Sequence, residues 1–379
     1  MGVRRGSLEG LAMSQPGVSP NPSVWRDRRV LITGHTGFKG SWLATWVSHL
    51  GAVAHGVALT PPTQPNAFEV LGLERHMTHQ IGDIRDPSVL EEAMARSQPE
   101  VVFHLAAQPL VRLSYRDPVA TFQTNVMGTV NLLDAVRRAP SVKVVVVVTS
   151  DKCYENREWP WGYRENDPLG GRDPYSASKA CAEIVTSAYR SSFLAPSDDA
   201  VPRIIVASAR AGNVVGGGDW GDDRIVPDAI RAFEAGVPLL VRNPNAIRPW
   251  QHVLDPLRGY LILAERGIAG DSSVAEAWNF GPDEGDDVTV GALADALVDR
   301  WGDGASWSAD AAPGNPHEAH SLTISAAKAR ARLGWRPRVP FRTSLDLAVE
   351  WYRAHHQGTG PDDMYALTTR QLTQFGDER

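Results

Sequence analysis

The sequence predicts an α/β protein whose main part is a doubly wound parallel sheet, followed by a smaller, mixed α/β region. Short apolar segments alternate with helical segments through the first half of the chain, which is the order of a parallel sheet built from βαβ units. Several of these segments, VVVVV at residues 144–148 above all, are apolar throughout. Strands of that composition are buried on both faces, so we expect helices on both sides of the sheet.

The predicted elements follow in order from Arg29. The segment RVLIT indicates a strand that ends before Gly34, and apolar residues recur at helical spacing within residues 41–50. Further strands are expected at residues 53–59, 82–86, 101–106, 142–150 and 201–209. Beyond Ala209 the strict alternation fades into segments rich in Trp, Arg and irregular turns. We therefore predict one domain over residues 25–208 and a second over residues 209–379.

Composition narrows the class of protein. The 379 residues include 38 Lys and Arg against 44 Asp and Glu, with no basic block, which disfavours a nucleic acid as partner. Two cysteines, Cys153 and Cys181, are too few for a disulfide framework. No apolar run approaches the roughly 20 residues of a membrane span. Residues 1–24 read as a disordered tail without a secretory signal, so we expect a cytoplasmic protein.

A glycine motif opens the first helix. Gly34, Gly37 and Gly40 form GxxGxxG directly after the first strand, and glycine lets backbone N–H groups and the helix amino terminus approach a pyrophosphate closely. An ordinary strand-to-helix turn is the alternative, whereas the absence of GK[ST] from this loop disfavours a nucleoside triphosphatase. Residues 25–208 are thus predicted to be a Rossmann-type dinucleotide-binding domain. Its loop is formed by Gly34, Thr36, Gly37, Phe38, Lys39 and Gly40.

The loop does not decide between NAD and NADP. No acid occurs in residues 53–60, where a carboxylate that binds the ribose is usual. Asp83 and Ile84 lie in the next predicted strand. There Asp83 either accepts a hydrogen bond from an adenine amino group or is an ordinary turn acid.

Two groups of residues are candidates for catalysis. Tyr175 and Lys179 stand four residues apart in YSASK, which places both on one face of a helix. A phenol beside an ammonium group ionises more readily, so Tyr175 is predicted to take a proton from a substrate hydroxyl while Lys179 also holds the nicotinamide ribose. Ser150, Asp151 and Lys152 follow the most apolar strand, at the end that faces the ligand crevice in a parallel sheet. An exposed helix pair and a solvated turn are the alternatives.

Longer motifs carry a resemblance to a known family. From about Trp25 to beyond Pro337 the chain resembles the extended short-chain dehydrogenase/reductase family, in TGHTGFKGSWL, HLAAQPLVR, NVMGT, TSDKCYEN, YSASKA, RAGNVVGGGDW, DDRIVPD and RPWQHVLDP. The glycine loop and YxxxK are shared by the whole superfamily. GHTGFKG, SDKCY, GNVVGGGDW and RPWQHV together are typical of the nucleotide-sugar 4,6-dehydratases that act on CDP-glucose. The resemblance implies NAD as a bound cofactor and a homodimer.

The resemblance also implies a reaction. Tyr175 would act as base in oxidation at C4 of the sugar, with Ser150 hydrogen-bonded to the oxygen. Loss of water across C5 and C6 needs an acid at O6 and a base at C5, for which it implies Asp151 and a neutral Lys152, and hydride then returns to C6. Related dTDP-glucose enzymes carry Glu in place of Lys152, and epimerases need no such pair. Another nucleotide-sugar dehydratase, an epimerase and a non-catalytic dinucleotide-binding regulator are the alternatives.

Binding residues follow from the same resemblance. The cofactor site would be completed by Leu105, Ala106, Ala107, Gln108 and Asn125, the last of which could instead make only a local hydrogen bond. The second domain is expected mainly to bind substrate, and arginine suits a pyrophosphate because its planar fork donates paired hydrogen bonds. The residues expected there are Arg112, Asn213, Arg224 and Arg248. For Arg112 and Arg224 an ion pair with Asp222 or Asp223 is the alternative. No metal site is expected.

Overall fold

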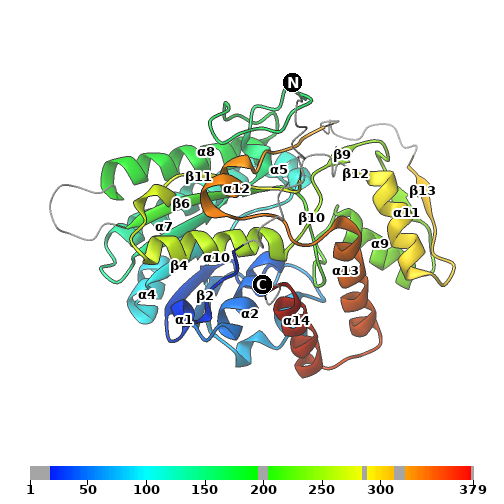
Figure 1. Cartoon of the computed structure of the whole chain (residues 1–379), viewed down its shortest axis with the longest axis horizontal. Coiled ribbons are helices and arrows are strands. Elements are labelled where there is room, and N and C mark those ends of the chain that lie inside the picture. Colours follow the sequence, from blue (N-terminus) through cyan, green and yellow to red (C-terminus); the bar gives the residue numbers. More distant parts are fainter. Residues whose placement is uncertain (1–17, 195–203, 284–287, 311–320, 377–379) are drawn as a thin grey trace, which may run out of the picture.

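The computed structural model describes residues 18–194, 204–283, 288–310 and 321–376. Its centre is a seven-stranded sheet in the order β11-β6-β5-β4-β1-β2-β3 (Figure 1). All neighbouring pairs are parallel. The strand order reverses between β1 and β4, which is where a doubly wound sheet forms its ligand crevice. The predicted fold class is confirmed.

The predicted strands match strands of the sheet except at residues 82–86, and the edge strand β11 was not predicted from the sequence. The sheet is formed by β1 (Arg29–Thr33), β2 (Val53–Ala58), β3 (Thr78–Ile81), β4 (Val101–His104), β5 (Val144–Val148), β6 (Ile205–Ala211) and β11 (Ala277–Phe280). The strand predicted at residues 82–86 is wrong, because the third strand ends at Ile81. Asp83 accepts a hydrogen bond from the Arg85 amide and Asp86 caps the next helix, so these short polar side chains form a turn. Residues 201–203 of the last predicted strand lie outside the described residues.

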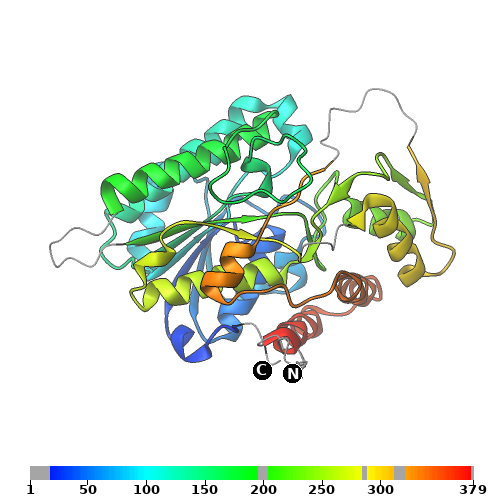
Figure 2. The same cartoon turned by 45° about the horizontal axis from the view of Figure 1, so that its top comes forward.

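Helices cover both faces of the sheet, as Figure 2 shows for the green α8 and the yellow-green α10. Along β5 the side chains of Val144, Val146 and Val148 pack on one side, and those of Val145 and Val147 on the other. One layer is formed by α4 (Pro87–Ser97), α7 (Gly128–Arg137) and α8 (Pro174–Tyr189), and the other includes α2 (Phe38–His49), α10 (Leu254–Ile268) and α14 (Pro361–Gly376). The strands are therefore buried from both sides, as their composition predicts.

The chain does not divide at the expected boundary between residues 208 and 209. That position lies inside β6, and the later elements β11 and α10 join the central sheet and its cover. The separate lobe at the right of Figures 1 and 2 is smaller. It contains α9 (Ile225–Glu234), β8 (Leu239–Val241), β9 (Ile247–Arg248), β12 (Val288–Thr289), α11 (Val290–Trp301) and β13 (Trp307–Ala309).

The remaining elements are mostly short, apart from α13. They are α3 (Ala67–Val70), η1 (Leu73–Arg75), α5 (Val111–Arg116), α6 (Pro118–Phe122), η2 (Gln123–Met127), η3 (Asp151–Cys153), η4 (Arg190–Leu194), β7 (Val214–Val215), β10 (Gln251–His252), η5 (Ser272–Val274), α12 (Ala327–Leu333) and α13 (Phe341–His356). Within the described part of the chain, none of the helices has the length and apolarity that a membrane crossing requires.

The expected tail is partly ordered. Residues 1–17 lie outside the described residues, but α1 (Pro22–Trp25) packs against the body of the protein and Trp25 is fully buried. The Trp25 indole and the Asn21 amide both donate to Oε1 of Glu265, at 2.7 and 2.6 Å. Residues 18–24 are therefore part of the fold, because a buried indole and a shared carboxylate hold them against α10.

Candidate active site

One large cavity, of about 1250 Å³, opens at the carboxyl ends of the central strands and extends to the lobe. Nearly all of the predicted site residues line it, although they come from segments far apart in the sequence. These are Gly34, Thr36, Gly37, Phe38, Lys39, Gly40, Asp83, Ile84, Leu105, Ala106, Ala107, Gln108, Arg112, Ser150, Asp151, Lys152, Tyr175, Lys179, Asn213, Arg224 and Arg248. The cavity thus lies where a doubly wound sheet binds its ligands.

The glycine loop is shaped for close backbone approach. Gly34 has a φ of +78°, and a Cβ at this position would lie 2.7 Å from the amide nitrogen of Ala106. A Cβ on Gly40 would lie 2.1 Å from the carbonyl oxygen of Gly34. Gly37 caps α2 without a side-chain hydrogen bond, so the first N–H groups of the helix stay available to an anion. This loop fits a dinucleotide pyrophosphate.

At the edge of the same crevice, Asp83 lines the cavity and also pairs with Arg85. Its carboxylate accepts from Nε and Nη2 of Arg85 at 2.8 and 2.6 Å. The hydrogen bond to Arg85 lowers the pKa of Asp83, so the carboxylate is ionised at neutral pH. An ionised acceptor at this position is compatible with either interpretation made from the sequence.

Ser150, Asp151 and Lys152, here called the Ser-Asp-Lys turn, follow β5 directly. Ser150 begins the short helix η3, accepts from the Lys152 amide at 3.2 Å and donates to Oδ1 of Asp151 at 2.9 Å. Nζ of Lys152 lies 3.9 Å from that same oxygen. Among the described residues, the buried Oδ2 of Asp151 has no hydrogen-bond partner. The turn therefore presents a cation and an unpartnered carboxylate oxygen side by side.

Tyr175 and Lys179 lie near the amino end of α8, both buried at the cavity wall. Burial raises the pKa of Tyr175 to about 12, against a hydrogen bond with Ser150 and the charge of Arg224. Burial also lowers the pKa of Lys179 to about 8. Nζ of Lys179 is directed toward the carbonyl of Val148, at 3.4 Å.

A second lysine belongs to this group. Burial lowers the pKa of Lys39 to about 8, the charge of Asp151 opposes this shift, and the charges of Arg224, Lys179 and Lys152 add to it. Lys39, in the glycine loop, therefore interacts electrostatically with Asp151 and Lys152 of the Ser-Asp-Lys turn. The cavity wall here is strongly cationic, with Asp151 as its anionic centre.

The arginines predicted to bind substrate line the cavity and form ion pairs as well. Nη1 of Arg224 donates to both carboxylate oxygens of Asp219, at 2.9 and 2.8 Å, which raises the pKa of Arg224. Arg112 lies 3.4 Å from Asp223. The alternative of an ion pair is thus realised for both, although Asp219 rather than Asp222 or Asp223 pairs with Arg224. Sequence reasoning missed Asp219. Nothing in its own segment, GDW, distinguishes it from an ordinary turn acid.

Asn125 is the one predicted site residue that does not line the cavity. Its side chain is buried, accepts from the Gln108 amide at 2.8 Å, and donates to the Gln108 carbonyl and the Ser178 hydroxyl at 3.1 and 2.8 Å. The prediction of direct cofactor contact is therefore corrected. Its two donated hydrogen bonds and one accepted hydrogen bond join the loop after β4 to α8.

Comparison with known proteins agrees with this geometry. The family model for GDP-mannose 4,6 dehydratase matches residues 31–347. The chain belongs to this nucleotide-sugar 4,6-dehydratase family. It is 50% identical to the CDP-glucose 4,6-dehydratase of Salmonella typhimurium, over 93% of this chain and 97% of the relative. It is 30% identical to the dTDP-glucose 4,6-dehydratase of Streptomyces antibioticus, over 86% and 92% of the two chains.

Solved structures of this family and of related epimerases share the fold. The dTDP-glucose 4,6-dehydratase of Streptomyces venezuelae, solved with NAD, superposes with a TM-score of 0.72 at 24% identity, covering 87% of this chain and 98% of that one. The UDP-glucose 4-epimerase of Thermus thermophilus, also in complex with NAD, superposes with a TM-score of 0.71 at 26% identity, covering 86% and 99%. These proteins are extended short-chain dehydrogenase/reductases, and so is this dehydratase family member.

The glycine loop provides a first prediction. Gly40→Ala is expected to destabilise the protein by about 1–3 kcal/mol, because its Cβ has no room beside the Gly34 carbonyl. It should also weaken binding of a dinucleotide, measured by calorimetric titration with NAD. Gly360→Ala is the matched control, since a Cβ at Gly360 meets no atom of the described structure within 4 Å. Equal unfolding temperatures and equal affinities for the two variants would contradict the role of this loop.

Proposed function

We propose that the chain is a CDP-glucose 4,6-dehydratase, which converts CDP-glucose to CDP-4-keto-6-deoxyglucose. The observation that carries the proposal is the Asp151–Lys152 pair in the same cavity as Tyr175. Removal of water across C5 and C6 needs an acid and a base in addition to Tyr175, whereas oxidation or epimerisation at C4 alone does not. The name and the 50% identity of the Salmonella typhimurium relative support CDP-glucose as the substrate.

The proposed cofactor is NAD, which when bound accepts hydride from C4 of the sugar and later returns it to C6. The glycine loop and residues 105–108 would hold it, since the absence of Cβ atoms at Gly34 and Gly40 keeps the loop backbone close to the ligand space. Asp83 and Ile84 would lie at its adenosine end. Lys179 would hold the nicotinamide ribose, because its buried ammonium faces the cavity.

In the oxidation step Tyr175 takes the proton of the C4 hydroxyl and Ser150 donates a hydrogen bond to the sugar oxygen. Tyr175 must ionise against its own burial, which raises its pKa to about 12. The two groups that favour the phenolate are Ser150, through its hydrogen bond, and Arg224, through its charge. Arg224 therefore has a part in the chemistry as well as in substrate binding.

In the elimination step Asp151 gives a proton to the departing O6 hydroxyl and Lys152 takes the proton from C5. Oδ2 of Asp151 suits this role, because it is buried and, within the described residues, unpartnered. This assignment requires the amine of Lys152 to be neutral when it acts as the base. The resemblance to the dehydratases that carry Lys at this position supports the assignment.

The cationic wall would bind the pyrophosphate of the substrate. Arg248, Asn213, Arg224 and Arg112 all line the part of the cavity that leads to the lobe. Asp219 and Asp223 pair with two of these arginines, which fixes the guanidinium groups before the substrate arrives. Side chains fixed in advance lose less conformational entropy on binding.

The test of the function is mass spectrometry of the product. The purified protein is incubated with NAD and, separately, with CDP-, dTDP- or UDP-glucose that carries deuterium at C4. We expect loss of one water from CDP-glucose, with deuterium retained at C6 of the product. Loss of water from another nucleotide sugar instead would reassign the base specificity, and no loss from any would favour an epimerase or a non-catalytic binder.

Replacement of Lys152 separates the two halves of the reaction. Lys152→Ala is expected to spare oxidation at C4 and to slow elimination by about 10²–10⁴-fold, the range for loss of a general base. The near-ultraviolet absorbance of reduced nicotinamide should therefore build up with substrate. Tyr175→Phe is the control, because it should abolish oxidation and leave NAD binding intact. A Lys152→Ala variant that shows no build-up would remove this lysine from the elimination step.

We further propose that the enzyme is a cytoplasmic homodimer that pairs helices including α8. The two cysteines are free thiols, which suits a reducing compartment. Val119, Met127 and Ile184 are large apolar side chains, 65%, 49% and 56% exposed, on elements that pack side by side. Sedimentation velocity should show a dimer that Ile184→Glu dissociates and the control Val237→Glu, in the lobe, does not. A monomeric wild-type protein would refute the dimer.

A further inference from the structure

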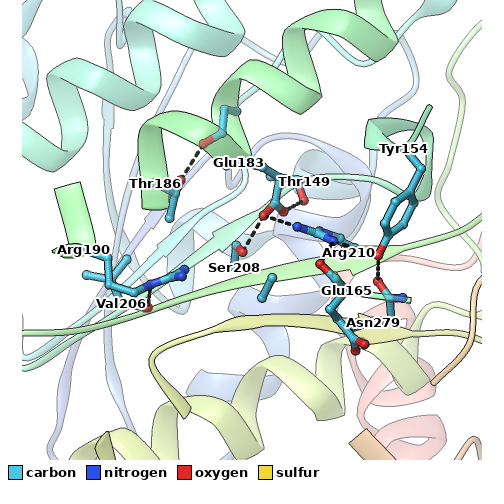
Figure 3. Close-up of polar contacts among 12 residues, drawn as sticks. Thr149, Tyr154, Glu165, Glu183, Thr186, Arg190, Val206, Ser208, Arg210 and Asn279 are labelled. Carbon is cyan, nitrogen blue, oxygen red and sulfur yellow. Dashed lines mark hydrogen bonds and ion pairs between the residues drawn. The ribbon is translucent and has the colours of Figure 1, made fainter. Parts of the chain in front are cut away.

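A buried ion pair lies beneath the candidate active site, outside the residues used so far. Glu183 on α8 and Arg210 on β6 are each 3% exposed, and Nη2 of Arg210 lies 2.8 Å from Oε2 of Glu183 (Figure 3). The Ser208 hydroxyl donates to the same oxygen at 2.7 Å. The charge of Arg210 and these hydrogen bonds lower the pKa of Glu183 despite its burial. Both side chains are therefore charged inside the protein.

The pair holds both ends of the Ser-Asp-Lys turn. The Thr149 hydroxyl, directly before the turn, donates to Oε1 of Glu183 at 2.5 Å. At the other end, two residues after Lys152, the Tyr154 hydroxyl accepts from Nη1 of Arg210 at 2.8 Å and donates to Asn279 at 2.7 Å. Figure 3 shows Thr149 beside Glu183 and Tyr154 beside Arg210. Contacts on both sides of the turn therefore join it to the same ion pair.

The pair also joins this turn to the other reacting groups. Glu183 stands four residues after Lys179 and eight after Tyr175 on α8, so the three share a helix face. Its charge opposes the fall in the pKa of Lys179 that burial causes. Arg210 lies near the end of β6, just before the segment that carries Asn213. One ion pair therefore connects three segments of the cavity wall.

A contribution to the stability of the protein does not by itself explain a buried ion pair at this position. Taking two charges out of water costs about as much as their attraction returns, and apolar replacements of similar volume are often as stable. A geometric role accounts better for its position, because the two charged groups bind the hydroxyl groups of Thr149 and Tyr154, which flank the Ser-Asp-Lys turn. Nε of Arg210 is even left buried without a partner among the described residues.

We propose that Glu183 and Arg210 are positioning residues, which fix the Ser-Asp-Lys turn relative to Tyr175 and Lys179 through Thr149 and Tyr154. The proposal rests on the proposed function for its catalytic consequence. Displacement of a reacting group by about 1 Å can cost on the order of 10²-fold in rate. The pair would therefore act on turnover through the turn, without touching substrate or cofactor.

The experiment loosens the turn and keeps the ion pair, because removing either charge would leave the other buried and could unfold the chain. Thr149→Val removes the hydroxyl that links Glu183 to the turn. Ser208→Ala is the matched control, since it removes a hydroxyl from the same carboxylate without a link to the turn. Tyr154→Phe tests the second contact. Each variant is assayed for unfolding temperature, kcat and KM with CDP-glucose, and amide hydrogen exchange over residues 149–154.

The expected result separates position from stability. Thr149→Val and Tyr154→Phe should exchange faster than wild type over residues 149–154 and lose about 10- to 100-fold in kcat with little change in KM. Ser208→Ala, at a similar unfolding temperature, should lose less than about threefold. Equal exchange and equal kcat for Thr149→Val and Ser208→Ala would overturn the proposal. A wild-type protein that is inactive on CDP-glucose would refute the proposed function. The positioning of the turn by Glu183 and Arg210 would still be tested, because hydrogen exchange is measured without substrate.

Discussion

The central strands are buried on both faces, and this constraint decides where chemistry can occur. The five valines of β5 are at most 8% exposed and pack into two different cores. A polar side chain along such a strand loses its hydration unless a partner satisfies it, as Glu183 does for Ser208 and Arg210 on β6. The Ser-Asp-Lys turn and the glycine loop instead lie beyond the ends of β5 and β1. Parallel pairing brings these ends to one edge of the sheet.

The balance of charge at that edge suits two diphosphates. The charges of Asp151, Arg224, Lys179 and Lys152 all act on Lys39. These cations outnumber the carboxylate of Asp151, and a positive cleft with low-dielectric walls concentrates anionic ligands. Burial lowers the pKa of Lys39 and of Lys179 to about 8, so both carry most of their charge near neutral pH. A dinucleotide and a nucleotide sugar would each supply the negative charge that this wall lacks.

The sequence predicted the structure correctly where the local residue pattern follows directly from the role of that segment in the fold. Apolar runs predict strands because burial selects those residues, and GxxGxxG predicts a loop because only glycine fits beside Ala106. Two of the misjudged or missed residues, Asn125 and Glu183, depend on long-range contacts, whereas the strand misplaced at residues 82–86 is a local turn. The sequence predicts Asn125 as a cofactor ligand, but in the structure its side chain hydrogen-bonds Gln108 and Ser178. Glu183 stands on the YxxxK face and was within reach of spacing arguments, but its partner Arg210 is brought to it only by the pairing of β5 with β6.

The predicted domain boundary fails for the same reason. The loop that carries Asp219 is built by elements from both ends of the chain. The Trp42 indole of α2 donates to the Gly217 carbonyl at 2.8 Å, and the Tyr352 hydroxyl of α13 donates to the Asp219 carbonyl at 2.5 Å. A Cβ on Gly217 would lie 2.1 Å from the Trp351 ring, so the loop is packed tightly between α2 and α13. Asp219 in turn fixes Arg224. Arg224, whose charge favours ionisation of Tyr175, thus depends on α13 for its position. No division of the chain at residue 208 would leave either part with a complete site.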